Sequence, residues 1–165
     1  RPIVSCLIGG SSRHHKFTTE VAASIGKTLS KFAKASGASL LITPSRRTPA
    51  ESFDALELAL GDVSRYIWRG KGENPYIAFL AFSDAILVTA DSVSMISDAC
   101  ASGKPVYVFP FDKCKSNKIH KFISYLQQEG SLRCFEGEIE TWGYNRLRDT
   151  QAAAREIKRN LDLRT

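Results

Sequence analysis

The sequence predicts an α/β fold: a Rossmann-like parallel sheet of about six strands with helices on both faces. Short apolar runs alternate along the chain with segments whose apolar residues recur every three or four positions, which are the patterns of strands and helices. The strand candidates are apolar at nearly every position, as is typical of parallel strands buried on both faces. With 165 residues, the chain is long enough for one domain of this kind.

Six apolar runs are the expected strands. Each is rich in aliphatic or aromatic residues and is bounded by glycine, proline or polar residues. In chain order they are Ile3–Ile8, Ser39–Thr43, Val63–Trp68, Ala85–Ala90, Pro105–Phe109 and Leu132–Phe135.

The first two helices have clear boundary signals. The first begins at about Thr18 and ends at Gly37, because glycine favours the left-handed conformation that follows a helix. The second begins at Thr48-Pro49-Ala50-Glu51, which combines an N-cap threonine, a proline at the first helical position and a capping-box glutamate. It ends at Gly61.

Three further helices lie among the later strands. The third begins at Asn74-Pro75, and because Ile77–Phe82 are apolar nearly all round, we expect them to be buried. The fourth is capped by Ser92 and ends before Gly103. The fifth ends before Gly130 and carries an apolar stripe that consists of Ile119, Phe122, Ile123 and Leu126.

The chain divides into a domain over residues 1–148 and a C-terminal helix within residues 149–165. That helix, expected over Asp149–Leu161, is polar, with only Ile157 and Leu161 as evenly spaced apolar residues. The chain starts at Arg1 rather than at a methionine, and its first residues already form a strand. We therefore expect a missing N-terminal domain of the same protein, onto which the last helix packs.

The composition excludes several classes of protein. Hydrophobic residues make up 43% and charged residues 24% of the chain, which excludes disordered and collagen-like proteins. No apolar run reaches the roughly 18 residues of a membrane-spanning helix, and no signal-peptide pattern is present. The four cysteines form no CxxC pair, so we expect reduced thiols in the cytoplasm and no metal site; they are Cys6, Cys100, Cys114 and Cys134.

The net charge of +6 indicates an anionic partner. In an open parallel sheet, ligands bind outside the carboxyl ends of the strands. The loops at these ends together carry the whole net charge, and they are residues 11–16, 45–48, 69–73, 89–92 and 111–118. This concentration favours a localised anion site over nucleic acid, which basic helix faces and interleaved aromatic residues usually bind.

The turn after the first strand is a candidate phosphate site. It reads Gly9-Gly10-Ser11-Ser12 and is followed by Arg13. A glycine-rich turn between a strand and a helix lets backbone N–H groups approach a phosphate, at the positive end of the helix dipole. The alternative is a tight turn with no ligand.

Two arginines, Arg46 and Arg47, follow the second strand. Such a pair can hold phosphate through paired N–H bonds, although we expect at least one of them to pair with a carboxylate of the protein itself. A remote alternative is a reductase in which Arg46 faces the 2′-phosphate of NADP. The segment GGSSRHH does not match the dinucleotide fingerprint, and no acidic residue ends the second strand.

Residues 83–111 read SDAILVTADSVSMISDACASGKPVYVFPF. This segment resembles the donor-binding segment of GT-B glycosyltransferases, in which a helix carries an acidic residue that accepts hydrogen bonds from the ribose of a nucleotide sugar. The resemblance places Asp98 at the acidic position and Ser92 and Ser94 at the start of its helix. Asp91-Ser92 replaces the glycine of those enzymes and brings a negative charge towards the pyrophosphate.

The motifs GGSSRHHKF, ITPSRRTP and YIWRGKGENPY, together with that segment, resemble the family of the plant mitochondrial fission protein called elongated mitochondria. The resemblance implies the carboxyl-terminal, donor-side half of a GT-B-like protein, with a nucleotide diphosphate or nucleotide sugar as ligand and no cofactor. The catalytic base would lie in the other half, so this chain alone would not turn over substrate. The alternative is a non-catalytic module that recruits a protein partner at a membrane.

Overall fold

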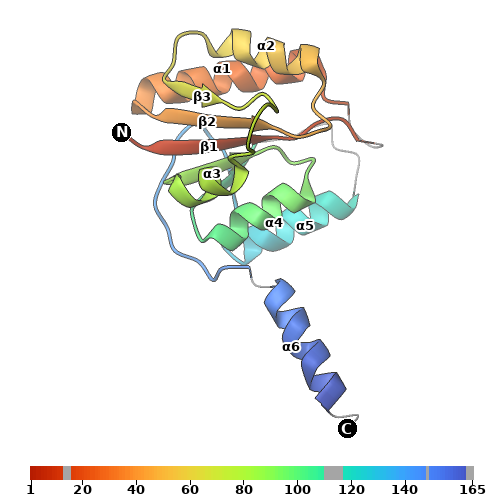
Figure 1. Cartoon of the computed structure of the whole chain (residues 1–165). Coiled ribbons are helices and arrows are strands. Elements are labelled where there is room, and N and C mark those ends of the chain that lie inside the picture. Colours follow the sequence, from red (N-terminus) through yellow and green to blue (C-terminus); the bar gives the residue numbers. More distant parts are fainter. Residues whose placement is uncertain (13–15, 110–116, 148, 163–165) are drawn as a thin grey trace.

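The computed structural model describes residues 1–12, 16–109, 117–147 and 149–162 (Figure 1). Its strands are β1 (Ile3–Ile8), β2 (Ser39–Pro44), β3 (Arg65–Ile67), β4 (Ala85–Val88), β5 (Val106–Val108) and β6 (Arg133–Cys134). Its helices are α1 (Thr19–Ser36), α2 (Ala50–Leu60), α3 (Tyr76–Phe82), α4 (Val93–Ser102), α5 (Asn117–Gln128) and α6 (Asp149–Asp162). All six strands and six helices that the sequence predicts are present.

The strands form one parallel sheet in the order β3-β2-β1-β4-β5-β6. Strand β1 lies at the centre, where Cys6 is in register with Ile42 of β2 and Leu87 of β4. The chain moves outward from β1 to β3 and then returns to place β4 on the other side of β1. This reversal makes the carboxyl ends of β1 and β4 the switch point at which such sheets bind ligands.

Helices cover both faces of the sheet, as the apolar strands predict (Figure 1). Helices α1 and α2 pack on one face, where Leu29 and Leu56 are fully buried. Helices α3, α4 and α5 pack on the other, where Ile96 and Leu126 are fully buried. Burial on both faces explains why the strands are apolar at successive positions.

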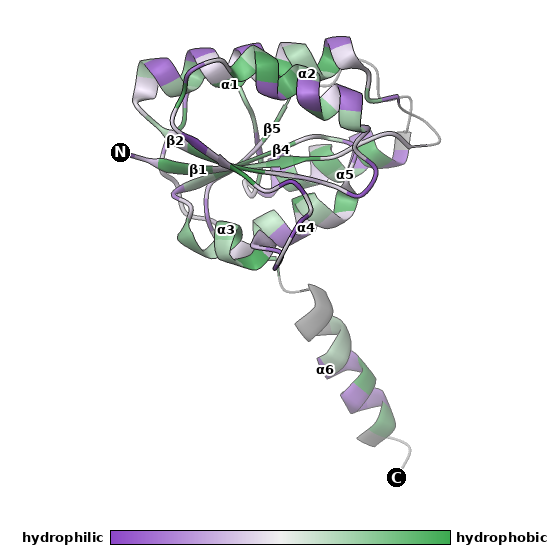
Figure 2. Ribbon diagram, turned by 45° about the horizontal axis from the view of Figure 1, so that its top comes forward, coloured by the Kyte–Doolittle hydropathy of each residue, from purple (hydrophilic) through white to green (hydrophobic). Residues whose placement is uncertain are grey.

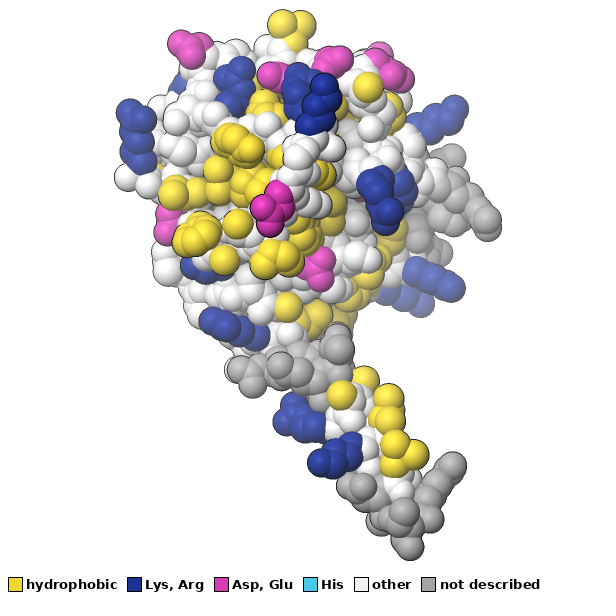
Figure 3. Space-filling view, viewed as in Figure 1, with side chains coloured by type: hydrophobic (Ala, Val, Ile, Leu, Met, Phe, Trp, Pro, Cys, Tyr) yellow, Lys and Arg dark blue, Asp and Glu magenta, His cyan; other side chains and the backbone are white. Residues whose placement is uncertain are grey.

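Helix α3 corrects one expectation. Phe79 and Leu80 are buried, but Ile77 and Phe82 are 72% and 74% exposed. The helix is hydrophobic along its whole length (Figure 2), yet only one side of it can face the sheet. Tyr66 of the edge strand β3 is also exposed, and its ring contacts the ring of Phe79. Hydrophobic side chains gather on the face of the molecule shown in Figure 3.

Helix α6 projects away from the rest of the domain (Figures 1 and 2). Ile157 and Leu161 are 61% and 60% exposed, and hydrophobic side chains follow one side of the helix while basic ones follow another (Figure 3). In the described ranges, no helix is both long enough and apolar enough to cross a membrane.

The two phenylalanines of α3 provide a stability test. We expect Phe79→Ala to lower the free energy of unfolding by about 3–5 kcal/mol, because it leaves a cavity beneath the helix. Phe82→Ala is the matched control and is expected to cost less than about 1 kcal/mol, because its ring is exposed. Urea denaturation of both variants measures the difference, and equal losses would contradict the packing of α3.

Candidate functional site

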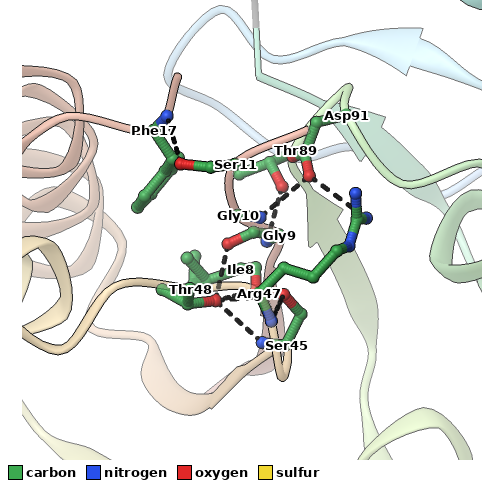
Figure 4. Close-up of polar contacts among 10 residues, drawn as sticks. All are labelled: Ile8, Gly9, Gly10, Ser11, Phe17, Ser45, Arg47, Thr48, Thr89 and Asp91. Atoms are coloured by element: carbon green, nitrogen blue, oxygen red, sulfur yellow. Dashed lines mark hydrogen bonds and ion pairs between the residues drawn. The ribbon is translucent and has the colours of Figure 1, made fainter. Parts of the chain in front are cut away.

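The turn after β1 is held by hydrogen bonds within the chain (Figure 4). The N–H of Gly9 donates to Thr89 Oγ1 at 2.7 Å, and the N–H of Gly10 donates to Asp91 Oδ2 at 2.8 Å. The N–H of Ser11 donates to the carbonyl oxygen of Arg47 at 3.1 Å. Three of the N–H groups in the turn that the sequence assigns to a phosphate therefore donate to the protein in this structure, and phosphate binding by this turn stays a prediction.

Close packing explains both glycines. A Cβ atom on Gly9 would lie 2.1 Å from Asp91 Oδ1, and one on Gly10 would lie 2.1 Å from the carbonyl oxygen of Arg47. Neither contact is possible without movement of the turns that follow β2 and β4. Of the other two residues of the predicted turn site, Ser12 is half-buried, and Arg13 lies outside the described residues.

Thr48 has a different role from the helix cap that the sequence predicts. Pro49 occupies the N-cap position of α2, and its side chain makes no capping hydrogen bond. The hydroxyl of Thr48 instead donates to the carbonyl oxygen of Gly9 at 2.6 Å and accepts the N–H of Ser45 at 3.0 Å (Figure 4). The threonine thus helps to join the turn after β2 to the turn after β1.

Asp91 is a buried acid in the turn after β4. Its side chain is 0% exposed, and Arg47 Nη2 lies 3.7 Å from its Oδ2. This ion pair confirms that one of the two arginines is a partner of a carboxylate of the protein. Oδ1 of Asp91 is buried and accepts no hydrogen bond from the part of the chain that the structure describes.

A groove of about 1160 Å³ runs along the carboxyl ends of β2, β3 and β4. It brings together five of the residues that the sequence nominates, which are Arg46, Arg47, Ser92, Ser94 and Asp98. Its other walls include Tyr76 and Trp68, and the glycine turn is not part of its lining. The predicted ligand residues therefore form two groups: one group lines the groove, and the other forms the glycine turn outside its lining.

Arg46 and Arg69 both line the groove, but they differ in whether an acidic side chain already pairs with them. Arg46 is exposed and makes no ion pair with any described residue. Arg69 pairs with Asp54 and Glu57 and lies over the ring of Phe53. Arg46 is consequently the arginine of the groove whose charge is available to a ligand.

The N-terminus of α4 also faces the groove. Ser92 occupies the N-cap position that the sequence predicts, but its side chain accepts no capping hydrogen bond. The N–H of Ile96 makes the first helical bond, to the carbonyl of Ser92, so the N–H groups before it have no acceptor within the helix. Ser92, Ser94 and Met95 line the groove, which brings this positive helix end to its wall.

Asp98 has a partner that the sequence analysis did not identify. The hydroxyl of Tyr76 donates to Asp98 Oδ2 at 2.9 Å. Burial, followed by this hydrogen bond and the carboxylate charge, raises the pKa of Tyr76 above its ordinary value, so the phenol remains a donor at neutral pH. The tyrosine orients a carboxylate that still has acceptor capacity for other groups.

The other missed wall residues come from the loop after β3. Trp68 donates its indole N–H to the carbonyl of Lys71 at 3.0 Å, which holds this loop in a tight turn. The available signal was position, because Trp68 and Arg69 follow the third strand at the same edge of the sheet as Arg46.

The order and direction of the strands define a Rossmann-like domain of the kind that forms one half of a GT-B glycosyltransferase. The glycotransferase of kitacinnamycin shares this fold, with a TM-score of 0.51 at 17% sequence identity over 84% of this chain and 31% of that one. The chain belongs to the mitochondrial fission ELM1 family, whose sequence model matches residues 1–161.

Two relatives extend the comparison. The mitochondrial fission protein ELM1 of Arabidopsis thaliana is 40% identical over 168 residues, which cover 99% of this chain and 39% of that protein. The uncharacterised protein RP120 of Rickettsia prowazekii (strain Madrid E) is 30% identical over 165 residues, which cover 96% of this chain and 46% of that protein. The chain thus spans less than half the length of either relative.

Gly9→Ala tests the packing of the turn. We expect this change to lower the free energy of unfolding by about 2–4 kcal/mol, because its methyl group would overlap the Asp91 carboxylate. Gly143→Ala is the control, since no atom lies within 4 Å of its Cβ position, and it is expected to change stability by less than about 0.5 kcal/mol. If Gly9→Ala leaves the free energy of unfolding unchanged in thermal or urea denaturation, the Asp91 carboxylate is not held against Gly9.

Cysteine reactivity tests burial in the two halves of the core. Burial raises the pKa of the Cys100 thiol to about 12 and raises that of Cys6 as well, whereas Cys134 is exposed. Cys114 lies outside the described residues, so the measurement uses a Cys114→Ser variant. At pH 8 a disulfide reagent is expected to modify one thiol per native chain and three after unfolding. Rapid modification of Cys6 or Cys100 in the native chain would contradict the burial of these two thiols.

Proposed function

We propose that this chain binds a nucleoside-diphosphate sugar in the groove, as the donor half of a glycosyltransferase-like protein. The observation that carries the proposal is the arrangement of Arg46, the N-terminus of α4 and Asp98 around one cavity of about 1160 Å³. The volume suits a ligand of nucleotide-sugar size. These three features offer a cation, backbone donors and an acceptor, which are the groups that such a ligand requires.

The diphosphate is assigned to the part of the groove between Arg46 and α4. An arginine can give two parallel hydrogen bonds to phosphate oxygens. The N–H groups of the first turn of α4, which have no acceptor within the helix, supply further donors, and the helix dipole favours an anion at this end. Both features are needed here, because Arg69 shares its charge with Asp54 and Glu57.

The ribose is assigned to Asp98. A carboxylate can accept hydrogen bonds from two neighbouring hydroxyls, and Tyr76 fixes the position of this one. The rest of a longer protein would close the groove and bring the acceptor together with the catalytic base. The lengths of the two relatives leave room for such a second half.

A second candidate is a non-catalytic module that recruits a protein partner at a membrane. It is favoured by the large apolar side chains that helix α3 and the edge strand β3 leave exposed, which are Tyr66, Ile77 and Phe82. Apolar surfaces of this kind often mark interaction sites. The two functions differ in their dependence on the groove, which makes them separable by experiment.

Ligand titration followed by backbone NMR tests the donor site. UDP, GDP, ADP, CMP and NADP are added separately to the full chain, and at least one nucleoside diphosphate is expected to shift residues around Arg46, Ser94 and Asp98. Arg46→Ala and Asp98→Ala should each weaken binding of that nucleotide by roughly tenfold or more, since each removes a hydrogen bond to a charged group.

Lys27→Ala is the matched control for loss of a cation, because Lys27 is exposed on α1 and does not line the groove. It should leave the affinity within about twofold of the original value. Saturable binding that is indifferent to both groove variants would contradict the proposed site. Preference for NADP would favour the reductase alternative, and silence with every nucleotide in a full-length relative would favour the recruitment module.

A further inference from the structure

The donors around Asp91 are those that would bind a phosphate oxygen. The N–H of Gly10, at the turn between a strand and a helix, points at Oδ2 from 2.8 Å. The guanidinium of Arg47 approaches the same oxygen from 3.7 Å. Figure 4 shows the two groups meeting the carboxylate from different turns. A glycine-turn amide and an arginine are thus directed at an anion that the chain itself supplies.

The carboxylate is fixed in this position by packing. Its side chain is 0% exposed, and it occupies the space that a Cβ atom on Gly9 would need. Because Oδ1 accepts no hydrogen bond from the described residues, the carboxylate uses its acceptor capacity only in part. The backbone between Thr89 and Asp91 holds it there, since Thr89 binds the neighbouring Gly9 amide.

Arg47 connects this buried anion to the groove. Its side chain is 46% exposed and belongs to the groove lining, whereas Asp91 does not. A diphosphate bound beside Arg46 would lie within reach of Arg47 as well. The diphosphate and the Asp91 carboxylate would then compete for the Arg47 guanidinium, and the ligand would interact with only part of the charge of that guanidinium.

We propose that Asp91 is an internal anion that occupies the donor site of the glycine turn and shares Arg47 with the ligand, and thereby limits the affinity of the groove for diphosphates. The proposal rests on the proposed function of the groove and concerns its regulation. It assigns diphosphate binding to Arg46 and α4 rather than to the Gly9-Gly10 turn. It also makes residue 91 the position that sets the strength of binding.

Asp91→Asn tests this proposal, because an asparagine oxygen can still accept the Gly10 N–H while the charge is lost. The probe is inorganic pyrophosphate, titrated calorimetrically into the full chain. We expect the Kd to fall by roughly fivefold or more, given the strength of a charge interaction at this depth. Asp62→Asn is the control, because it makes the same change in net charge at an exposed position outside the groove and should change the Kd by less than about twofold.

A double variant identifies the route of the effect. In an Arg47→Ala background, Asp91→Asn should give less than about twofold tightening, because the shared guanidinium is gone. If Asp91→Asn does not fold, the original chain supplies the test. Saturation with pyrophosphate should then shift the signals of the Arg47 side-chain N–H and the Gly10 amide. The amide signal of Gly26, which lies in α1 where it packs against α2, should not shift.

The outcomes separate the two proposals. Binding by the original chain with no tightening in Asp91→Asn, or with Arg47 and Gly10 signals unmoved, overturns the role of Asp91 alone. Tightening that depends on Arg47 supports that role even if no nucleotide is preferred over pyrophosphate. Absence of saturable binding in the original chain and in Asp91→Asn overturns both the internal anion and the groove as a diphosphate site.

Discussion

The buried carboxylate of Asp91 connects the turns that follow β1, β2 and β4. It accepts the Gly10 amide, faces Arg47 and lies against Gly9, while Thr48 ties the second of these turns to the first. Burial of a carboxylate is costly unless its partners are well placed. Because those partners come from separate turns, the interaction requires one relative arrangement of them. This arrangement determines the shape of the groove, since the turns after β2 and β4 form two of its walls.

Much of the fold could be predicted from the sequence because local patterns reflect burial directly. Helix α1 begins after Thr18 and ends before Gly37 as its signals indicate, since both are short-range backbone effects. Strand β3 is shorter than the predicted run of Val63–Trp68 and covers Arg65–Ile67, although the N–H of Trp68 still donates to the carbonyl of Ile42 in β2. The exposed side of α3 could not be foreseen, because a helix that is apolar all round carries no periodic signal for the side that meets the core.

The candidate site was predictable to the extent that topology determines it. Parallel strands gather their carboxyl ends at one edge, so the loops that carry Arg46 and Ser92 were expected near each other, and both residues line the groove. Asp98 was nominated by the resemblance to GT-B enzymes, and it lines the same groove. The hydrogen-bond partners of these residues were not predictable, because the bonds join residues far apart in the chain. Asp98 meets Tyr76 across 22 positions, and Asp91 meets Gly10 across 81. Their formation depends on distances of a few ångströms that only the packed structure defines.

The sheet is closed to growth at both edges. Strands β3 and β6 have only 3 and 2 residues, and each begins with an arginine. An edge of this length offers few unpaired backbone groups, and its charged side chains oppose the approach of another strand. Copies of the domain at high local concentration therefore find little backbone to pair with at the edges of the described sheet. Self-association would depend on exposed side chains, such as those of Tyr66, Ile77 and Phe82, and would be sensitive to single substitutions.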